Sequence, residues 1–541
     1  MLVNSNIPFL SSFFAFLTTV VSSYPVHPHG SIADLGYSRY QGTVLENGIT
    51  QWLGMRYAAP PLGDLRFRAP QDPTPNPTLQ IADTFGDVCL STGAITITDG
   101  FSEDCLFVDV FAPTHPNHPL PVYVYIQGGG FNSNSNANYN GSGLVTASDL
   151  NIVVVTFNYR VGPYGFLASK EVQEEGDLNI GLKDQRKVFE WVQKYIREFG
   201  GNPNSVTLGG SSAGAASIDL HLSAYGGRND NLFHAAAAES QSFGVLFTVE
   251  GSQYQYDALV ARAGCSSAED TLSCLRGLTT AELQAVNINI PSPNGGGDPP
   301  LYMYSNVVDG DFTTDFTYKL YQKGKFIRVP VIFGDDTNGG TIFTPKDTDN
   351  VTAMNRFLKD QYPNLTNAQL ARIDKYYPEA QQFPNSGRYW RAVSNAYGQM
   401  RYMCPGLYIS SAYSKSLIPS WNYRYNVEDP DQVASGLGVP HTVETNAIWG
   451  PENVNGGAPA SYSTSLNHNI VPLMQGYWTS FIRTHDPNIY RLQGSPRWEL
   501  WNSWNMNRIR LETNTTTMER VDKETRVRCA YFESIGVVLQ Q

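Results

Sequence analysis

The chain has 541 residues, of which 41% are hydrophobic and 16% charged, and its 37 basic and 49 acidic residues give a net charge of −12. This composition excludes a disordered chain, which would be less hydrophobic, and a coiled coil, which would be richer in charge. The acidic balance argues against a general nucleic-acid or anionic-membrane binder, and length alone would allow about three domains.

The N-terminus carries an apolar run from about Ile7 to Val21, followed by the small residues Ser22 and Ser23. A run of this length is too short to span a membrane comfortably, and small residues at its end suit signal peptidase. We therefore expect residues 1–23 to be a cleaved secretory signal, although no Lys or Arg precedes the run, and the mature protein to be extracellular. No other segment predicts a transmembrane helix or a lipid anchor.

The rest of the chain alternates short apolar runs with helical patterns. Strands are expected over 121–127, 151–158, 205–210, 234–239, 328–334 and 420–426, and helices over 182–199 and 213–222. This alternation predicts an α/β fold with a mostly parallel sheet covered by helices on both faces. Because ligands of such sheets bind beyond the carboxyl ends of the strands, residues that directly follow a strand are the candidates for a site.

The first such candidate is Ser212, in the sequence GSSAG at residues 210–214. G-x-S-x-G between a strand and a helix is the pattern of a nucleophile elbow, a sharp turn that needs small neighbours and exposes its serine at the head of the helix. The alternative interpretation is a glycine-rich helix cap with Ser212 as its N-cap.

A glycine-rich loop, residues 128–131 (GGGF), follows the strand expected over 121–127. In lipases and esterases such a loop supplies backbone N–H groups to the oxyanion hole. The predicted donors are the N–H groups of Gly129, Gly130 and Ala213. A flexible loop is the alternative, while a P-loop is excluded because no Lys-Ser/Thr pair follows.

The general base is expected after the nucleophile, because α/β-hydrolases order their triad as Ser, acid, His. Of the histidines that follow Ser212, only His441 lies in a loop after a late strand. His221 belongs to the elbow helix and His234 begins a strand, while His468 and His485 are expected in a helix and at a helix end.

The cysteines and glycosylation sequons fit an extracellular protein. An even number of cysteines with no Cys-x-x-Cys pair makes zinc and redox roles weak, and spacing alone leaves the disulfide pairing open. The predicted chemistry needs no metal or cofactor. The cysteines are Cys89, Cys105, Cys265, Cys274, Cys404 and Cys529, and the sequons lie at Asn140, Asn350, Asn364 and Asn514.

Together these motifs resemble the type-B carboxylesterase/lipase family, which includes cholinesterases and fungal extracellular lipases. The similarity runs over nearly the whole mature chain. It is carried by residues 56–71 (RYAAPPLGDLRFRAPQ), 103–110 (EDCLFVDV), 158–161 (NYRV), 165–167 (GFL), 179–185 (NIGLKDQ), 199–203 (FGGNP), 210–215 (GSSAGA) and the block from His441 through Glu444 to Trp449-Gly450.

The resemblance implies a single α/β-hydrolase domain with long insertions over residues 24–541, rather than three domains. It also implies a small-molecule ester as substrate and the disulfides Cys89–Cys105, Cys265–Cys274 and Cys404–Cys529. Gln127 stands where the family often has a His or an aromatic residue, and Ser211 where it often has Glu. Neither change removes a group that the chemistry requires.

A third departure affects the triad itself. The family usually carries its catalytic Glu in a block similar to G-x-x-x-D-E-G-T, and residues 334–341 here read GDDTNGGT, with Gly339 at the Glu position. Glu239, at the end of a strand, is the first candidate for a replacement acid. Asp336, with Asp335 beside it, is the second. The third interpretation is that no acid is present and that Ser212 and His441 work as a dyad.

The sequence therefore predicts a secreted serine ester hydrolase in which Ser212 attacks the ester and His441 acts as base. Two alternatives stay open: a catalytically weak binding protein on the same scaffold, and an acyltransferase. The pattern does not identify the ester or the oligomeric state. Phe131, Phe343 and Trp449 are candidates for an aromatic pocket, or else ordinary core residues.

Overall fold

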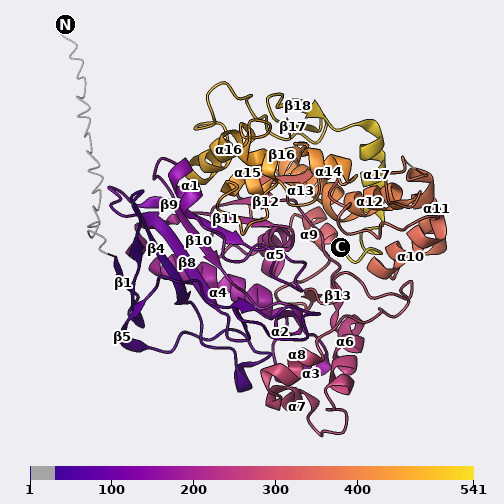
Figure 1. The fold of residues 1–541 in the computed structure, drawn as a ribbon, viewed down its shortest axis with the longest axis horizontal. Coiled ribbons are helices and arrows are strands. Elements are labelled where there is room, and N and C mark those ends of the chain that lie inside the picture. Colours follow the sequence, from indigo (N-terminus) through magenta and orange to yellow (C-terminus); the bar gives the residue numbers. More distant parts are fainter. Residues whose placement is uncertain (2–30, 380) are drawn as a thin grey trace.

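The computed structural model describes residue 1, residues 31–379 and residues 381–541. The segment expected to be a signal peptide, apart from Met1, lies outside the described residues. Figure 1 shows the whole fold, with the sheet running through its middle.

An eleven-stranded sheet forms the centre of the fold, in the order β18-β17-β16-β15-β12-β11-β9-β10-β8-β4-β3. The strands from β17 to β10 pair in parallel, whereas β18 at one edge and β8, β4 and β3 at the other are antiparallel. Its strands are β3 (Thr43–Val44), β4 (Ile49–Arg56), β8 (Phe107–Pro113), β9 (Leu120–Ile126), β10 (Val153–Phe157), β11 (Gly201–Ser211), β12 (Ala235–Glu239), β15 (Val331–Asp336), β16 (Ser420–Tyr425), β17 (Asn507–Leu511) and β18 (Thr517–Arg520).

Three small sheets lie outside this centre. They pair β1 (Ile32–Asp34) and β5 (Asn76–Ile81) with β2 (Ser38–Gln41), β6 (Val88–Cys89) with β7 (Phe101–Ser102), and β13 (Phe247–Thr248) with β14 (Val307–Val308).

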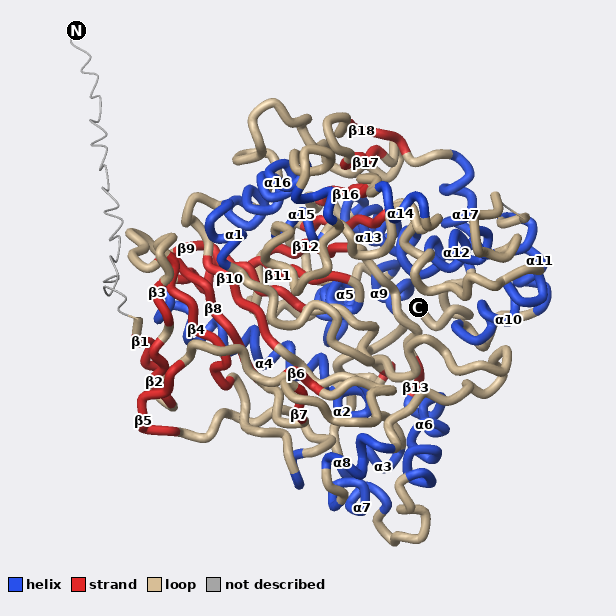
Figure 2. Tube along the Cα trace, viewed as in Figure 1, coloured by secondary structure: helices blue, strands red, loops and turns tan. Residues whose placement is uncertain are grey.

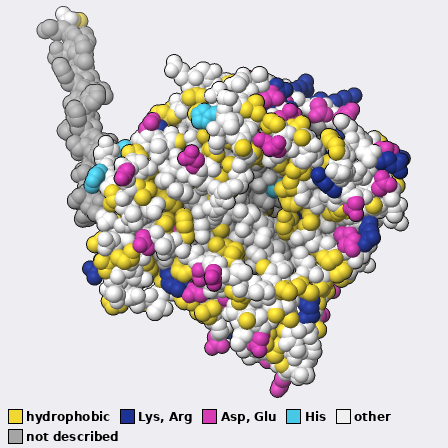
Figure 3. Space-filling model, in the orientation of Figure 1, with side chains coloured by type: hydrophobic (Ala, Val, Ile, Leu, Met, Phe, Trp, Pro, Cys, Tyr) yellow, Lys and Arg dark blue, Asp and Glu magenta, His cyan; other side chains and the backbone are white. Residues whose placement is uncertain are grey.

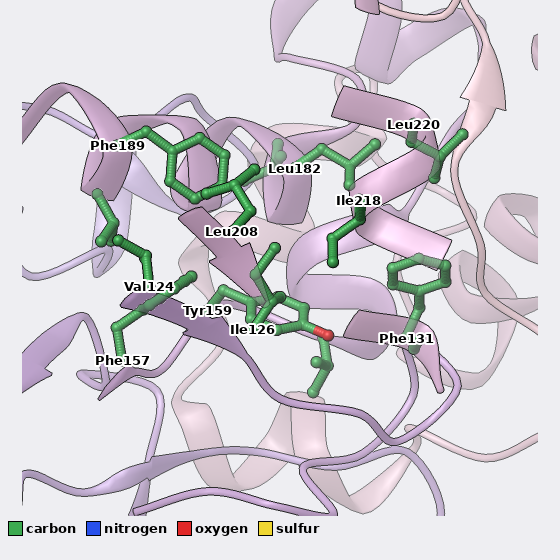
Figure 4. Packing of buried hydrophobic residues seen from close by; sticks show 14 of the residues in the cluster. Val124, Ile126, Phe131, Phe157, Tyr159, Leu182, Phe189, Leu208, Ile218 and Leu220 are labelled. Atoms are coloured by element: carbon green, nitrogen blue, oxygen red, sulfur yellow. The ribbon is translucent and has the colours of Figure 1, made fainter. Parts of the chain in front are cut away.

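Helices cover both faces of the sheet because its buried strands are apolar on both sides (Figure 2). In β9, Val122, Val124 and Ile126 join the core under α4 (Ile180–Tyr195) and α5 (Ala213–Gly227), whereas Tyr123 and Tyr125 join the opposite core under α16 (Ile470–Thr484). Figure 4 shows the first of these cores, where side chains of β9 and β11 meet those of the two helices: Val124, Ile126, Leu208, Leu182, Phe189 and Ile218.

The α-helices are α1 (Ser142–Ala147), α2 (Gly162–Phe166), α3 (Lys170–Glu175), α4 (Ile180–Tyr195), α5 (Ala213–Gly227), α6 (Val249–Arg262), α7 (Thr271–Gly277), α8 (Thr280–Ala285), α9 (Thr317–Gln322), α10 (Val351–Gln361), α11 (Asn367–Tyr376), α12 (Trp390–Gly398), α13 (Cys404–Lys415), α14 (Pro430–Ala434), α15 (Thr445–Trp449), α16 (Ile470–Thr484) and α17 (Lys523–Ser534). The six predicted strands and two predicted helices are confirmed. The helix expected over 182–199 continues beyond α4 as a 3-10 turn over Ile196–Phe199, and α5 departs from helical geometry at Ala224, Tyr225 and Gly226.

The three disulfides implied by the family resemblance are confirmed: Cys89–Cys105, Cys265–Cys274 and Cys404–Cys529. The last one joins the first residue of α13 to α17 across 125 residues of sequence. Closing so long a loop restricts the unfolded chain and stabilises the attachment of α17.

None of the described helices is long and apolar enough to cross a membrane. The sequon residues Asn350, Asn364 and Asn514 are exposed, and Asn140 is half-buried. Three of the four sequons are therefore open to solvent, and their glycosylation stays a prediction.

Candidate active site

Ser212 occupies the single residue between the end of β11 and the start of α5. Its backbone is strained, with φ 57° and ψ −116°, a conformation that non-glycine residues adopt at a cost. The serine side chain makes no N-capping hydrogen bond to α5, so the helix-cap interpretation has no support here. The residue is 9% exposed, at the carboxyl end of the parallel strands.

The glycines around Ser212 are required by close packing. A Cβ on Gly214 would lie 1.9 Å from the carbonyl oxygen of Ile126, and one on Gly210 would lie 2.7 Å from the carbonyl carbon of Gly214. Any larger residue would push α5 away from β9 and change the direction of the Ser212 side chain.

The glycine loop after β9 packs directly against the elbow. A Cβ on Gly128 would lie 3.0 Å from the Cβ of Ser212, and Gly129 and Gly130 adopt positive φ angles of 114° and 61°. No hydrogen bond within the described part of the chain uses the N–H groups of Gly129, Gly130 or Ala213. These donors are available to an oxygen bound beside Ser212.

His441 lies in the loop between α14 and α15 and is 5% exposed. Tyr402 stacks on its imidazole with ring centroids 4.1 Å apart, and Phe343 approaches edge-on at 5.3 Å. Burial, together with the positive charge of Arg401, lowers the pKa of His441 to about 3. The imidazole is therefore neutral at physiological pH, as a proton acceptor must be.

The imidazole has no hydrogen-bonding partner among the described residues. Its Nε2 is buried without one, and no described hydrogen bond joins either ring nitrogen to Ser212 or to a carboxylate. Hydrogen bonds between catalytic groups often tighten only when substrate binds.

The other histidines after Ser212 have separate surroundings. His221 of α5 contacts Gln185 through Nε2 at 2.9 Å, and His234 accepts a hydrogen bond from the Val206 N–H. His485 caps α16, as expected for a helix end. His468 was expected in a helix but lies in the turn before α16, because that helix begins only at Ile470.

Gly339 lies beside the imidazole of His441. A Cβ at this position would lie 4.0 Å from His441 Nδ1, 3.5 Å from Tyr402 Cδ2 and 3.8 Å from the Asp336 carbonyl oxygen, all ordinary contacts. A side chain at residue 339 would therefore point toward the nitrogen that a triad acid contacts, and the glycine leaves that place without a carboxylate.

Glu239 is held away from the imidazole by other partners. Its Oε1 accepts hydrogen bonds from the Tyr123 hydroxyl at 2.7 Å and from Trp478 Nε1 at 3.0 Å, and its Oε2 is buried without a partner. Burial raises the pKa of this carboxyl to about 8. At neutral pH Glu239 is mostly protonated, which is the wrong state for stabilising an imidazolium.

Asp336 belongs to a buried pair of carboxyl groups with Glu444. The Ser240 hydroxyl lies between them, 2.6 Å from Asp336 Oδ2 and 2.7 Å from Glu444 Oε1, and the Thr442 N–H donates to the same Asp336 oxygen at 2.8 Å. Burial, and for Asp336 also the charge of Glu444, raises both pKa values. The pair fixes the backbone beside His441 without contacting its ring.

Asp335 lies on the opposite side of β15 from Asp336, as neighbours in a strand must. Both of its carboxylate oxygens are buried without a hydrogen-bond partner, and one lies 3.2 Å from where a Cβ on Gly406 would be. It packs against α13 and has no contact with His441.

The aromatic candidates divide between site and core. Phe343 contacts His441, but Trp449 packs on Tyr123 and Tyr125 in the core under α16, and Phe131 packs on Phe166. Tyr402 and Arg401 carry no signal in the sequence, since a π-helical turn between α12 and α13 brings Tyr402 onto the histidine, with Arg401 beside it, only in the folded chain. Figure 3 shows that the molecular surface is hollowed near the middle of the face in view.

A strained serine, a histidine that follows the parallel strand β16 and free N–H groups beside the serine form the arrangement expected of a serine hydrolase. A sequence model of the carboxylesterase family matches residues 32–530. The chain belongs to the carboxylesterase family. The predicted α/β-hydrolase fold and carboxylesterase/lipase-type hydrolase activity are thereby confirmed.

Curated and solved relatives agree with this assignment. This carboxylesterase-family chain is 31% identical over 499 residues to Secreted lipase 4 of Gibberella zeae, covering 86% of this chain and 85% of the relative. It is 30% identical over 503 residues to Lipase 2 of Geotrichum candidum, with 82% and 85% covered. The crystal structure of Aspergillus niger EstA matches with a TM-score of 0.91 and 44% identity, over 94% of this chain and 99% of that one.

Proposed function

We propose that the protein hydrolyses carboxylic esters through an acyl-enzyme formed on Ser212. The observation that carries this proposal is the strained Ser212 with the unused N–H groups of Gly129, Gly130 and Ala213 around it. His441 takes the serine proton, gives it to the departing alcohol and then activates water to release the acid. A protein that only binds esters would have no need of strain at one serine.

In this proposal Ser212 and His441 work as a dyad, because neither Asp336 nor Glu239 contacts the imidazole and burial raises the pKa of both carboxyl groups. Asp336 and Gly339 line a cavity of about 30 Å³, and Asp336 Oδ1 is buried without a hydrogen-bond partner. His441 is not among the residues that line this cavity, so the cavity does not connect Asp336 to the imidazole. Glu239 already accepts hydrogen bonds from Tyr123 and Trp478 through its Oε1.

The test is turnover of short-chain p-nitrophenyl esters by the purified protein beside Ser212→Ala, Asp336→Asn and Glu239→Gln. We expect Ser212→Ala to abolish turnover, and Asp336→Asn and Glu239→Gln to change kcat little. Activity that survives in Ser212→Ala would overturn the proposed nucleophile, and a collapse confined to Asp336→Asn or Glu239→Gln would overturn the dyad and assign the acid to that residue.

We further propose that the protein acts outside the cell. Three disulfides and three exposed sequons support this proposal, as does the similarity to a relative named a secreted lipase. Sequencing the N-terminus of the protein recovered from culture medium tests it, with cleavage expected near Ser23.

A further inference from the structure

Arg401 is a buried cation beside the candidate active site, and it has no counter-charge. The residue is 7% exposed, and no carboxylate of the described chain lies within ion-pairing distance of its guanidinium. Its Nε is buried without a hydrogen-bond partner. Burying an unpaired charge is costly, so such groups are normally paired or bind a ligand.

Aromatic side chains hold Arg401 at the wall of the site. Its guanidinium carbon lies 5.2 Å from the centre of the Tyr302 ring and 6.0 Å from that of Tyr402. Tyr402 stacks on His441, and the Tyr302 ring lies 2.1 Å from where a Cβ on Gly130 would be. Arg401 therefore lies next to the two rings that contact the proposed base and the glycine loop.

The π-helical turn over Gln399–Met403 fixes this placement. It inserts between α12 and α13, and the Arg401 carbonyl oxygen accepts a hydrogen bond from the Phe243 N–H at 2.8 Å. The Tyr362 hydroxyl is a further polar neighbour of the guanidinium. These neighbours are neutral phenols and backbone groups, so none of them supplies negative charge.

We propose that Arg401 binds a carboxylate carried by the acyl part of the ester, and that half-esters of dicarboxylic acids are therefore preferred substrates. This inference rests on the proposed esterase function. A planar guanidinium pairs with a carboxylate through two parallel hydrogen bonds, which suits it to this recognition.

A bound carboxylate would also change the electrostatics of His441. The charge of Arg401 contributes to the low pKa of the imidazole, after the larger effect of burial. An anion on Arg401 compensates that charge and favours the imidazolium that forms as Ser212 is deprotonated. The substrate would thus supply part of the negative charge that Gly339 does not provide.

The test compares kcat/KM for monoethyl esters of linear dicarboxylic acids of four to ten carbons with that for ethyl hexanoate, a neutral ester, by pH-stat titration. We expect one chain length to exceed ethyl hexanoate by about 10- to 100-fold, the range for a hydrogen bond to a charged group. Arg401→Met, which keeps the stem without the charge, should remove this preference, and Arg401→Lys should retain part of it.

Two results would overturn the inference while the esterase function stands: ethyl hexanoate hydrolysed as well as every half-ester, or a preference for half-esters that persists in Arg401→Met. Should Arg401→Met fail to fold, inhibition of ethyl hexanoate hydrolysis in the wild type decides. The free dicarboxylate should inhibit at least 10-fold more strongly than its diamide, and equal inhibition contradicts the proposal. If ethyl hexanoate and all half-esters are inert, the proposed function fails and this inference with it.

Discussion

Replacing Gly339 with glutamate should increase turnover, which is unusual for a substitution in an active site. The backbone φ of Gly339 lies outside the left-handed region, and a Cβ there meets nothing closer than 3.5 Å. An L-residue is therefore tolerated, and its side chain starts 4.0 Å from His441 Nδ1.

The size of the gain follows from electrostatics. Unit charges about 4 Å apart attract by about 4 kcal/mol at an effective dielectric constant of 20. Burial of the new carboxylate beside Asp336 and Glu444 opposes part of that attraction. We expect a net stabilisation of the transition state by about 1.5–3 kcal/mol, which is a 10- to 100-fold rise in kcat.

The assay is steady-state hydrolysis of p-nitrophenyl butyrate from pH 4 to pH 9, with Gly339→Gln and Gly339→Ala as controls that fill the space without charge. A carboxylate should also raise the pKa of His441 from about 3, so the acidic limb of the pH profile should move upward only in Gly339→Glu. The predicted role of a carboxylate at residue 339 is wrong if folded Gly339→Glu is no faster than Gly339→Gln, or if its pH profile is unchanged.

Further predictions concern pH, the oxyanion hole and stability. Because burial keeps His441 neutral with a pKa of about 3, kcat/KM should stay level from pH 8 to pH 5; a fall centred near pH 6.5 would contradict this. The depressed pKa also means that the unfolded state binds more protons, so His441 contributes a loss of stability as pH falls from 6.5 toward 3. Burial raises the pKa of Glu239 to about 8, so the contribution of this carboxyl to the free energy of unfolding decreases as pH rises from 4.5 through 8. Glu239→Gln should remove that pH dependence in urea titrations. Gly130→Ala should lower kcat by about 10²–10³-fold, since the methyl group would overlap the Tyr302 ring and displace an oxyanion donor. Cys404→Ser combined with Cys529→Ser should reduce the free energy of unfolding by about 2–5 kcal/mol, and an unchanged urea midpoint would be inconsistent with the role assigned to this disulfide.

Local sequence patterns were sufficient to predict the elements that position Ser212. Runs of β-branched and aromatic residues indicated β9 and β10, and the GSSAG sequence indicated the turn at Ser212. These features could be predicted because each depends on neighbours in sequence: a strand's apolar run, or the small residues that a tight turn demands.

The surroundings of His441 could not be predicted in the same way. Tyr402 reaches the imidazole from a π-helical turn that also carries Arg401, and periodicity does not reveal where one extra residue enters a helix. The pairing of Asp336 with Glu444 through Ser240 joins three separate segments of the chain, so no local pattern records it. Glu239 was a reasonable candidate acid by its place at a strand end, but only the fold reveals its contacts with Tyr123 and Trp478.

The central claim is that Ser212 is a nucleophile activated by His441. The most direct measurement is mass-spectrometric detection of a fluorophosphonate adduct on the wild-type protein, beside Ser212→Ala and His441→Ala. We expect one adduct per chain on Ser212, none on Ser212→Ala and much slower labelling of His441→Ala. A wild-type protein that is folded but is neither labelled nor able to hydrolyse short-chain esters would contradict the proposed role of Ser212.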